Sequence, residues 1–282
     1  MTSTKEAVAS AVGGKAHLKR GYAPISGLQM YYEIEGTGEP LVFIHPALGF
    51  GGLEKFPGLT QRHSLVRLDL QGHGRTADLR DRPLSIEQYA EDVIALLDYL
   101  GISKADIFGE SYGGNAAVLI AIRHPERVRR VAAYSATFGP AEIAHDPAMV
   151  RFDHPPTPYS RDTQFQRESY KSVAPDAQSW PTLWDKVTQI RWSGFSREEL
   201  LAIRVPMLIM VGDRDFVRLE HAIETFHAVP SAELAVIPDA GHFALYSEPE
   251  RVMPIVQHFL EKAATRSPVA HAGLGYHPGE SR

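Results

Sequence analysis

The stretch GESYG, residues 109–113, fits the pattern G-x-S-x-G and decides how the rest of the chain is interpreted. An apolar run at 105–108 precedes it and a run rich in small residues, 113–124, follows it, which is typical of a strand, a sharp turn and a helix. Such a turn holds the serine Oγ out of the sheet, and its flanking glycines remove Cβ atoms that would collide across it. The context therefore predicts an exposed nucleophile at Ser111.

The composition excludes several kinds of partner and chemistry. The 282 residues are 44% hydrophobic and carry a net charge of −5 with both signs interspersed, so neither nucleic acid nor a membrane surface is expected as a partner. There is no cysteine, which excludes disulfides, thiolate nucleophiles and cysteine metal sites. No continuous apolar run is typical of a secretory signal or a membrane span. We expect a soluble, cytoplasmic protein that needs no metal or cofactor; its oligomeric state stays open.

Strand and helix patterns alternate along the chain. Ser85 and Gln88 form a capping box at the start of one helix, and Pro254 should kink the last helix or delay its start. The predicted strands are 28–33, 41–45, 65–70, 105–108, 128–134, 206–211 and 233–237, and the predicted helices are 85–100, 113–124, 181–190, 218–228 and 248–263. Alternation of short apolar strands with helices predicts an α/β fold, in which a mainly parallel central sheet has helices on both faces.

The chain divides into a core, an insertion and two tails. The predicted α/β core comprises residues 21–136 and 205–264. Residues 137–204 contain no buried-strand runs and hold all three tryptophans, so we predict a helical cap over the carboxyl edge of the sheet, where open α/β sheets bind ligands. Residues 1–20 and 265–282 are predicted to be flexible tails.

Aromatic side chains of the predicted cap are candidates for substrate contacts. They would favour an apolar or aromatic acyl or alcohol group. The candidate substrate-binding residues are Trp180, Trp184, Trp192 and Tyr159. Each of them could instead only pack the cap onto the core. Basic residues of the same segment, Arg151, His154, Arg161 and Arg167, could equally mark a polar group, so the substrate stays open.

A serine hydroxyl becomes nucleophilic when a histidine takes its proton and an acid orients that histidine. Downstream of Ser111, Asp213 and Asp215 follow one predicted strand and His242 follows the next. The order Ser…Asp…His is one of the chain orders in which such triads occur. The residues alone leave Asp213 and Asp215 open as the acid.

Stabilising the oxyanion of the reaction requires two N–H donors. The backbone N–H of Tyr112, the residue after the nucleophile, is the first candidate. The second should come from the loop after the predicted strand 41–45, where Pro46 has no N–H and Ala47 is therefore the candidate donor.

These motifs resemble the α/β-hydrolase superfamily over roughly residues 22–263. Residues 69–76, DLQGHGRT, look like the D-x-x-G-H-G-x-S/T turn of these enzymes, in which His73 would be a structural residue. The chain looks most like the small, capped serine carboxylesterases described as pimeloyl-carrier-protein methyl ester esterase-like. The resemblance implies the α/β-hydrolase fold with a cap. It also places the acid last in a G-x-x-D turn, which selects Asp215 and leaves Asp213 to cap the turn or the next helix.

The chain departs from the family pattern at one position. These proteins usually have His-Gly where this chain has His45-Pro46. Proline fixes φ, could reshape the oxyanion loop and could make its peptide bond cis. The departure concerns Ala47 more than the triad.

The sequence thus indicates a serine hydrolase that cleaves a small-molecule carboxylic ester or lactone through an acyl-enzyme on Ser111. His242 would act as base and then acid, and Asp215 would orient it. Two other functions stay open. The triad could serve C–C bond hydrolysis or another non-ester reaction, or the chain could be a ligand-binding, receptor-like protein with little turnover.

Overall fold

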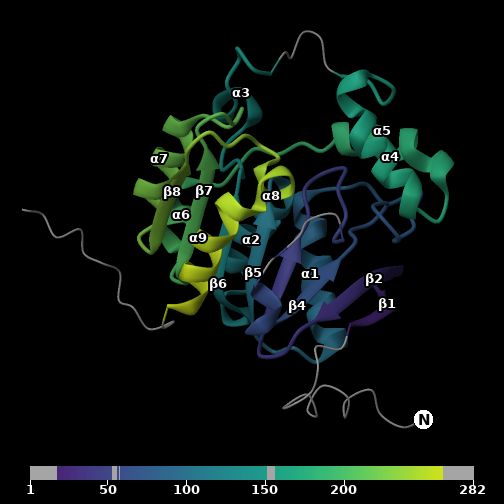
Figure 1. The fold of residues 1–282 in the computed structure, drawn as a ribbon, viewed down its shortest axis with the longest axis horizontal. Coiled ribbons are helices and arrows are strands. Elements are labelled where there is room, and N and C mark those ends of the chain that lie inside the picture. Colours follow the sequence, from purple (N-terminus) through teal and green to yellow (C-terminus); the bar gives the residue numbers. More distant parts are fainter. Residues whose placement is uncertain (1–17, 53–55, 57, 151–155, 263–282) are drawn as a thin grey trace, which may run out of the picture.

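A mainly parallel sheet forms the centre of the molecule (Figure 1). The computed structural model describes residues 18–52, 56, 58–150 and 156–262. Within them the sheet has eight strands in the order β1-β2-β4-β3-β5-β6-β7-β8, and β2 alone runs against the others. The strands are β1 Lys19–Ile25, β2 Leu28–Glu35, β3 Glu39–Ile44, β4 His63–Leu68, β5 Ala105–Glu110, β6 Val128–Tyr134, β7 Met207–Gly212 and β8 Ala232–Ile237. The predicted fold class is confirmed.

Alternate residues of each strand face opposite sides of the sheet. In β3, Leu41 and Phe43 belong to one buried apolar cluster, and the residues that alternate with them belong to the other. Helices α1 (Ile86–Leu100) and α2 (Tyr112–Arg123) complete one cluster, and α9 (Pro249–Glu261) completes the other. Helices therefore cover both faces, which explains why the central strands read as continuous apolar runs.

Local sequence signals set the helix ends. The Ser85 side chain accepts a hydrogen bond from the Gln88 N–H at 3.1 Å, which caps the start of α1. Gly101 ends the same helix with φ 70°, a left-handed conformation that glycine adopts without strain. Helix α9 begins at Pro249 and continues past Pro254, so the internal proline does not delay its start.

The first strand of the sheet was not predicted. Strand β1 begins at Lys19, so the predicted flexible tail, 1–20, overlaps it and that prediction is wrong at its last residues. Ser26 and Gly27, with φ 50° and 80°, make the tight turn into β2. Residues 1–17 and the whole of the predicted C-terminal tail lie outside the described residues.

A helical segment connects β6 to β7. It contains α3 (Ala141–Ala144), α4 (Gln164–Val173), α5 (Trp180–Thr188) and α6 (Arg197–Ala202). Figure 1 shows α4 and α5 together on one side of the molecule and α3 apart from them. The predicted helix at 181–190 corresponds to α5, and the role of the segment as a cap stays a prediction.

After β7 the chain forms α7 (Leu219–Ala228), and after β8 it forms the short α8 (Ala244–Ser247). Among the helices in the described ranges, none combines the length and the apolar character that crossing a bilayer would take.

Candidate active site

Ser111 lies in a strained turn between β5 and α2. Strand β5 ends at Glu110 and α2 begins at Tyr112, so Ser111 alone makes the turn, with φ 52° and ψ −122°. This backbone conformation is rare for a residue with a Cβ, and strain of this kind concentrates at functional sites. The Ser111 N–H donates to the carbonyl oxygen of Tyr134 at 2.8 Å, which ties the turn to the end of β6.

The flanking glycines are required because three backbone segments meet at this turn. A Cβ on Gly109 would collide with the carbonyl oxygen of Gly113, and one on Gly113 would collide with the carbonyl oxygen of Ile44, at the end of β3. The nucleophile turn and the loop after β3 are therefore packed backbone to backbone. The observed strand, turn and helix match those expected around Ser111.

Asp215 and His242 are joined by a hydrogen bond. His242 Nδ1 lies 3.0 Å from Asp215 Oδ1, and both side chains are buried. Asp215 follows β7 and His242 follows β8, while Ser111 follows β5. Since these strands are parallel, their carboxyl ends meet at one edge of the sheet. The three predicted triad residues share this edge.

The surroundings of Asp215 favour its ionised form. Burial alone would raise its pKa, but hydrogen bonds from His242, the Ser135 Oγ and the Val217 N–H, together with the charge of His242, hold the pKa below its ordinary value. An ionised Asp215 can only accept a hydrogen bond, so the Nδ1 of His242 that faces it carries the proton. That tautomer leaves the other ring nitrogen of His242 free of a proton, as a general base requires.

The other aspartates of the region lie elsewhere. The Asp213 side chain is exposed, and its carboxylate lies 3.9 Å from the Arg214 guanidinium. Asp239 is also exposed, has φ 54° and faces Arg251 at 3.7 Å. The structure thus brings Asp215, and neither of these two, to the ring of His242.

Aromatic packing fixes the plane of the His242 ring, which sequence reasoning did not anticipate. Phe216 stacks on His242 with ring centroids 4.0 Å apart, and Phe243 meets the ring edge-on at 5.2 Å. His145 meets the ring of Phe216 edge-on at 5.0 Å. Burial, followed by the charge of His242, lowers the pKa of His145 to about 4, so it stays neutral near pH 7. The nearness of Phe216 to Asp215 in sequence is the one signal that could have found this contact.

The predicted oxyanion loop after β3 is held by His45. Its Nδ1 donates to the Pro46 carbonyl oxygen at 2.7 Å, and its Nε2 accepts from the Leu70 N–H at 3.0 Å. Burial lowers the pKa of His45 to about 4, so the ring is neutral as both bonds need. The peptide bond before Pro46 is trans, and Ala47 is half-buried. The donor roles of Ala47 and Tyr112 stay predictions.

Residues 69–76 form a turn locked by Asp69. The Asp69 carboxylate accepts from the N–H groups of Gly51, at 2.8 Å, and Arg75, at 2.7 Å. His73 is fully buried in the turn and its Nδ1 donates to the Gln71 carbonyl oxygen at 2.8 Å, which fits the structural role expected of it. Burial, followed by the nearby His45, lowers the pKa of His73 to about 3.

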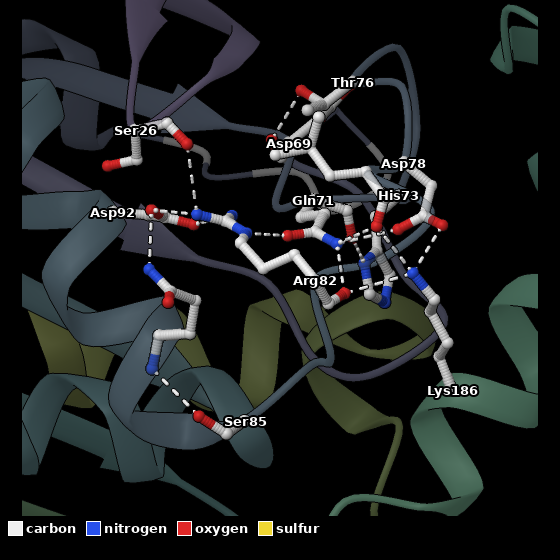
Figure 2. Close-up of polar contacts among 12 residues, drawn as sticks. Ser26, Asp69, Gln71, His73, Thr76, Asp78, Arg82, Ser85, Asp92 and Lys186 are labelled. Carbon is white, nitrogen blue, oxygen red and sulfur yellow. Dashed lines mark hydrogen bonds and ion pairs between the residues drawn. The ribbon is translucent and has the colours of Figure 1, made fainter.

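A polar network connects this turn to the helical segment (Figure 2). Lys186, on α5, donates to Asp78 Oδ2 at 2.7 Å and to the carbonyl oxygens of Leu79 and Arg82. The Gln71 side-chain nitrogen donates to Asp78 Oδ1 at 2.8 Å and to the Arg82 carbonyl oxygen. The Gln71 side-chain oxygen accepts a hydrogen bond from the Arg82 guanidinium. Arg82 in turn pairs with Asp92, which is fully buried in α1. The contacts of Lys186 were missed because they join residues 104 to 108 positions apart.

The predicted substrate-binding aromatics differ in their surroundings. Trp180 is buried and donates to the Pro158 carbonyl oxygen at 2.7 Å, and Trp184 is buried beside it. Trp192 is half-buried and donates to the Thr137 carbonyl oxygen at 2.9 Å. Tyr159 is exposed. The burial of Trp180 and Trp184 fits the alternative interpretation, in which these side chains pack the helical segment onto the core. Substrate contact by any of the four aromatics stays a prediction.

Two basic residues considered with these aromatics, Arg151 and His154, lie outside the described residues. Arg167 donates to the Pro158 carbonyl oxygen at 3.2 Å and pairs with Glu168, so its contacts lie within the helical segment.

Fold and site together define an α/β hydrolase. Residues 41–255 match the alpha/beta hydrolase family, and this range extends from within β3 to the middle of α9 and includes all three triad positions. The chain belongs to that family.

Its relatives carry several activities. The chain is 29% identical over 260 residues to the dihydrolipoyllysine-residue acetyltransferase component of the acetoin cleaving system of Pseudomonas putida, covering 83% of this chain and 67% of the relative. It is 26% identical to the 2-hydroxymuconate semialdehyde hydrolase of the same organism, covering 81% and 89%. Among solved structures, Est816, an N-acyl homoserine lactone degrading enzyme, superposes with a TM-score of 0.69 at 25% identity over 86% of this chain and all of that chain.

Proposed function

We propose that the protein hydrolyses a carboxylic ester or lactone through an acyl-enzyme on Ser111. The observation that carries the proposal is the hydrogen bond from His242 to the buried Asp215, on the same sheet edge as the strained Ser111. In this proposal the buried carboxylate, the histidine tautomer that it fixes and the elbow serine at the same sheet edge act as one unit. It is the arrangement that activates a serine hydroxyl.

The reaction would follow from these positions. The free nitrogen of His242 accepts the Ser111 hydroxyl proton as Oγ attacks the substrate carbonyl carbon. Asp215 stabilises the resulting imidazolium, and the N–H groups of Tyr112 and Ala47 stabilise the oxyanion. His242 then gives its proton to the leaving alkoxide. Water attacks the acyl-enzyme by the same steps and releases the acid.

One chemical argument and one comparison support an ester or lactone as the substrate. The leaving alkoxide of an ester or a lactone is a group that a single histidine can protonate. The structural similarity to Est816 extends over most of the chain, and Est816 is an enzyme that degrades a lactone. For a lactone the leaving alkoxide stays attached to the acyl group, so ring opening needs no further residue.

A second candidate is hydrolysis of a C–C bond beside a carbonyl group. The similarity to 2-hydroxymuconate semialdehyde hydrolase, over 81% of this chain, favours it. In that reaction the leaving group is a carbon that must be protonated as the bond breaks. The same serine, histidine and aspartate would serve, and the difference would lie in the residues that hold the substrate.

The two candidates are separated by a burst experiment. Wild-type protein mixed with p-nitrophenyl acetate should release one equivalent of p-nitrophenol per site in a burst, followed by steady turnover, and Ser111→Ala should show neither. A panel of lactones and 2-hydroxymuconate semialdehyde is then compared by kcat/KM. Turnover of the semialdehyde with no burst and no lactone turnover would replace the first candidate by the second.

A further inference from the structure

The last residue of β6 and the residue after it bond Ser111, Asp215 and the residue before His242. Strand β6 lies between β5, which leads to Ser111, and β7, which leads to Asp215. The carbonyl oxygen of Tyr134 accepts the Ser111 N–H at 2.8 Å. The hydroxyl of Tyr134 donates to the carbonyl oxygen of Gly241 at 2.5 Å, directly before His242. Ser135 Oγ donates to Asp215 Oδ2.

Ser135 is held in a conformation that its surroundings must enforce. Its φ is 53°, in the left-handed region, and its side chain is buried. The Ser135 N–H donates to the Met210 carbonyl oxygen of β7 at 2.9 Å, so the strained residue is anchored to the strand that carries the acid. Strain in a buried residue persists only where neighbouring contacts determine it, and it concentrates at functional sites.

Ser135 completes the hydrogen bonding of a buried carboxylate. Asp215 Oδ1 accepts from His242 Nδ1 at 3.0 Å and from the Val217 N–H at 3.0 Å. The only other bond that the described residues give this carboxylate reaches Oδ2 from Ser135. Without it, Oδ2 would be a buried charged oxygen with no donor, and the carboxylate could rotate about its own axis.

We propose that Tyr134 and Ser135 are the positioning residues of the triad, with Ser135 fixing the orientation of the Asp215 carboxylate and Tyr134 fixing the loop that carries His242. The inference rests on the proposed function. Neither residue touches the reacting atoms. Ser135 acts through Asp215, and Tyr134 acts through the backbone on both sides of the site.

The test compares hydroxyl deletions that differ in backbone strain. Ser135→Gly removes the hydroxyl and also relieves the strain of the positive φ. Ser135→Ala removes the hydroxyl but keeps that strain. Both should lower kcat by roughly ten-fold or more with KM within about two-fold of wild type, because a hydrogen bond to a charged group is lost. Tyr134→Phe should lower kcat similarly, because it removes the bond to the Gly241 carbonyl oxygen.

Two readouts separate positioning from general destabilisation. The low-field proton resonance of the His242 Nδ1–H should shift in both Ser135 deletions, because the carboxylate that it bonds loses a hydrogen bond. The matched control is Thr225→Val, which removes a buried hydroxyl that donates to the His221 carbonyl oxygen on α7, at 2.9 Å. It should lower the melting temperature and leave kcat and the resonance unchanged.

The outcomes distinguish the two levels of inference. If wild type forms an acyl-enzyme but Ser135→Gly has wild-type kcat, the positioning role is wrong while the proposed function stands. Losses of kcat that merely follow the melting temperature, in Thr225→Val as in Ser135→Gly, would also overturn it. If wild-type Ser111 forms no acyl-enzyme, the proposed function fails and the positioning role fails with it.

Discussion

Lys186 Nζ lies 2.7 Å from Asp78 Oδ2 and joins helix α5 to the loop between β4 and α1, across 108 positions of sequence. Both side chains are largely buried, and Lys186 also donates to two carbonyl oxygens of that loop. Gln71 and Arg82 carry the contact onward to the buried Asp92. This ammonium group and the network beneath it therefore form one polar attachment of the helical segment to the core, beside the backbone bonds of Ala144 and Asp146 to the loop after β7 and the packing of buried side chains such as Leu183.

Removing that ammonium group should loosen the segment. Lys186→Met keeps most of the side-chain length and leaves Asp78 without its cation, so we expect the free energy of unfolding to fall by about 2 kcal/mol. Urea unfolding at pH 7 measures it. The control is Lys171→Met on α4, whose exposed pair with Glu168 spans 3.4 Å and should contribute little to stability because solvent screens it. Equal effects of the two substitutions would contradict the importance of the network.

Asp215→Asn should abolish most activity, whereas Asp213→Asn should not. Loss of the carboxylate removes the group that fixes the His242 tautomer, and kcat should fall by about 10³- to 10⁴-fold. Asp213 is exposed and faces Arg214, so its amide variant should stay within about two-fold of wild type. Steady-state kinetics on the best substrate of the panel decides the matter. Comparable losses would mean that the acid is assigned wrongly.

The glycine after Tyr112 should tolerate no side chain. A Cβ on Gly113 would collide with the Ile44 carbonyl oxygen, so Gly113→Ala should cost about 3 kcal/mol or more, or prevent folding. Gly101→Ala is the matched control, because a Cβ there meets nothing within 4 Å and only the φ of 70° opposes it. It should cost about 1 kcal/mol. Thermal unfolding monitored by circular dichroism compares them; a mild effect of Gly113→Ala would show that the turn is looser than described.

Buried histidines should make the protein sensitive to acid. Burial lowers the pKa of His45 to about 4 and that of His73 to about 3, from the ordinary 6.5. Below pH 6.5 the unfolded chain therefore binds protons that the folded chain does not, and stability falls until the pH nears these folded values. Each histidine contributes up to about 1.4 kcal/mol per pH unit. His73→Gln should reduce the slope of unfolding free energy against pH between 6.5 and 4; an unchanged slope would contradict the buried neutral state.

The sequence predicted the features that depend on short-range patterns. Periodicity located every strand from β2 to β8, and Ser85 and Gly101 marked the ends of α1. The pattern around Ser111 identified the strained turn because a serine between close-packed backbones demands glycines on both sides. Strand β1 was missed although the Ser26-Gly27 pair is a turn signal, since the charged residues before it resemble a tail.

The features that were missed depend on packing between distant segments. Nothing in the residues around Ser135 indicates that its hydroxyl bonds Asp215, 80 positions away, or that Phe216 stacks on His242. The His45 ring was noted only for the proline that follows it, yet it ties its loop to Leu70. Such contacts are set by strand order and register, which a local pattern does not contain.

The most direct measurement of the central claim is labelling with a fluorophosphonate followed by intact-mass and peptide mass spectrometry. Folded wild-type protein should gain one adduct, located on Ser111, because His242 and Asp215 are proposed to activate that hydroxyl. Ser111→Ala should gain none, and His242→Asn should label far more slowly. Wild-type protein that gains no adduct, or gains it on another serine at the same rate in Ser111→Ala, would contradict Ser111 as the nucleophile.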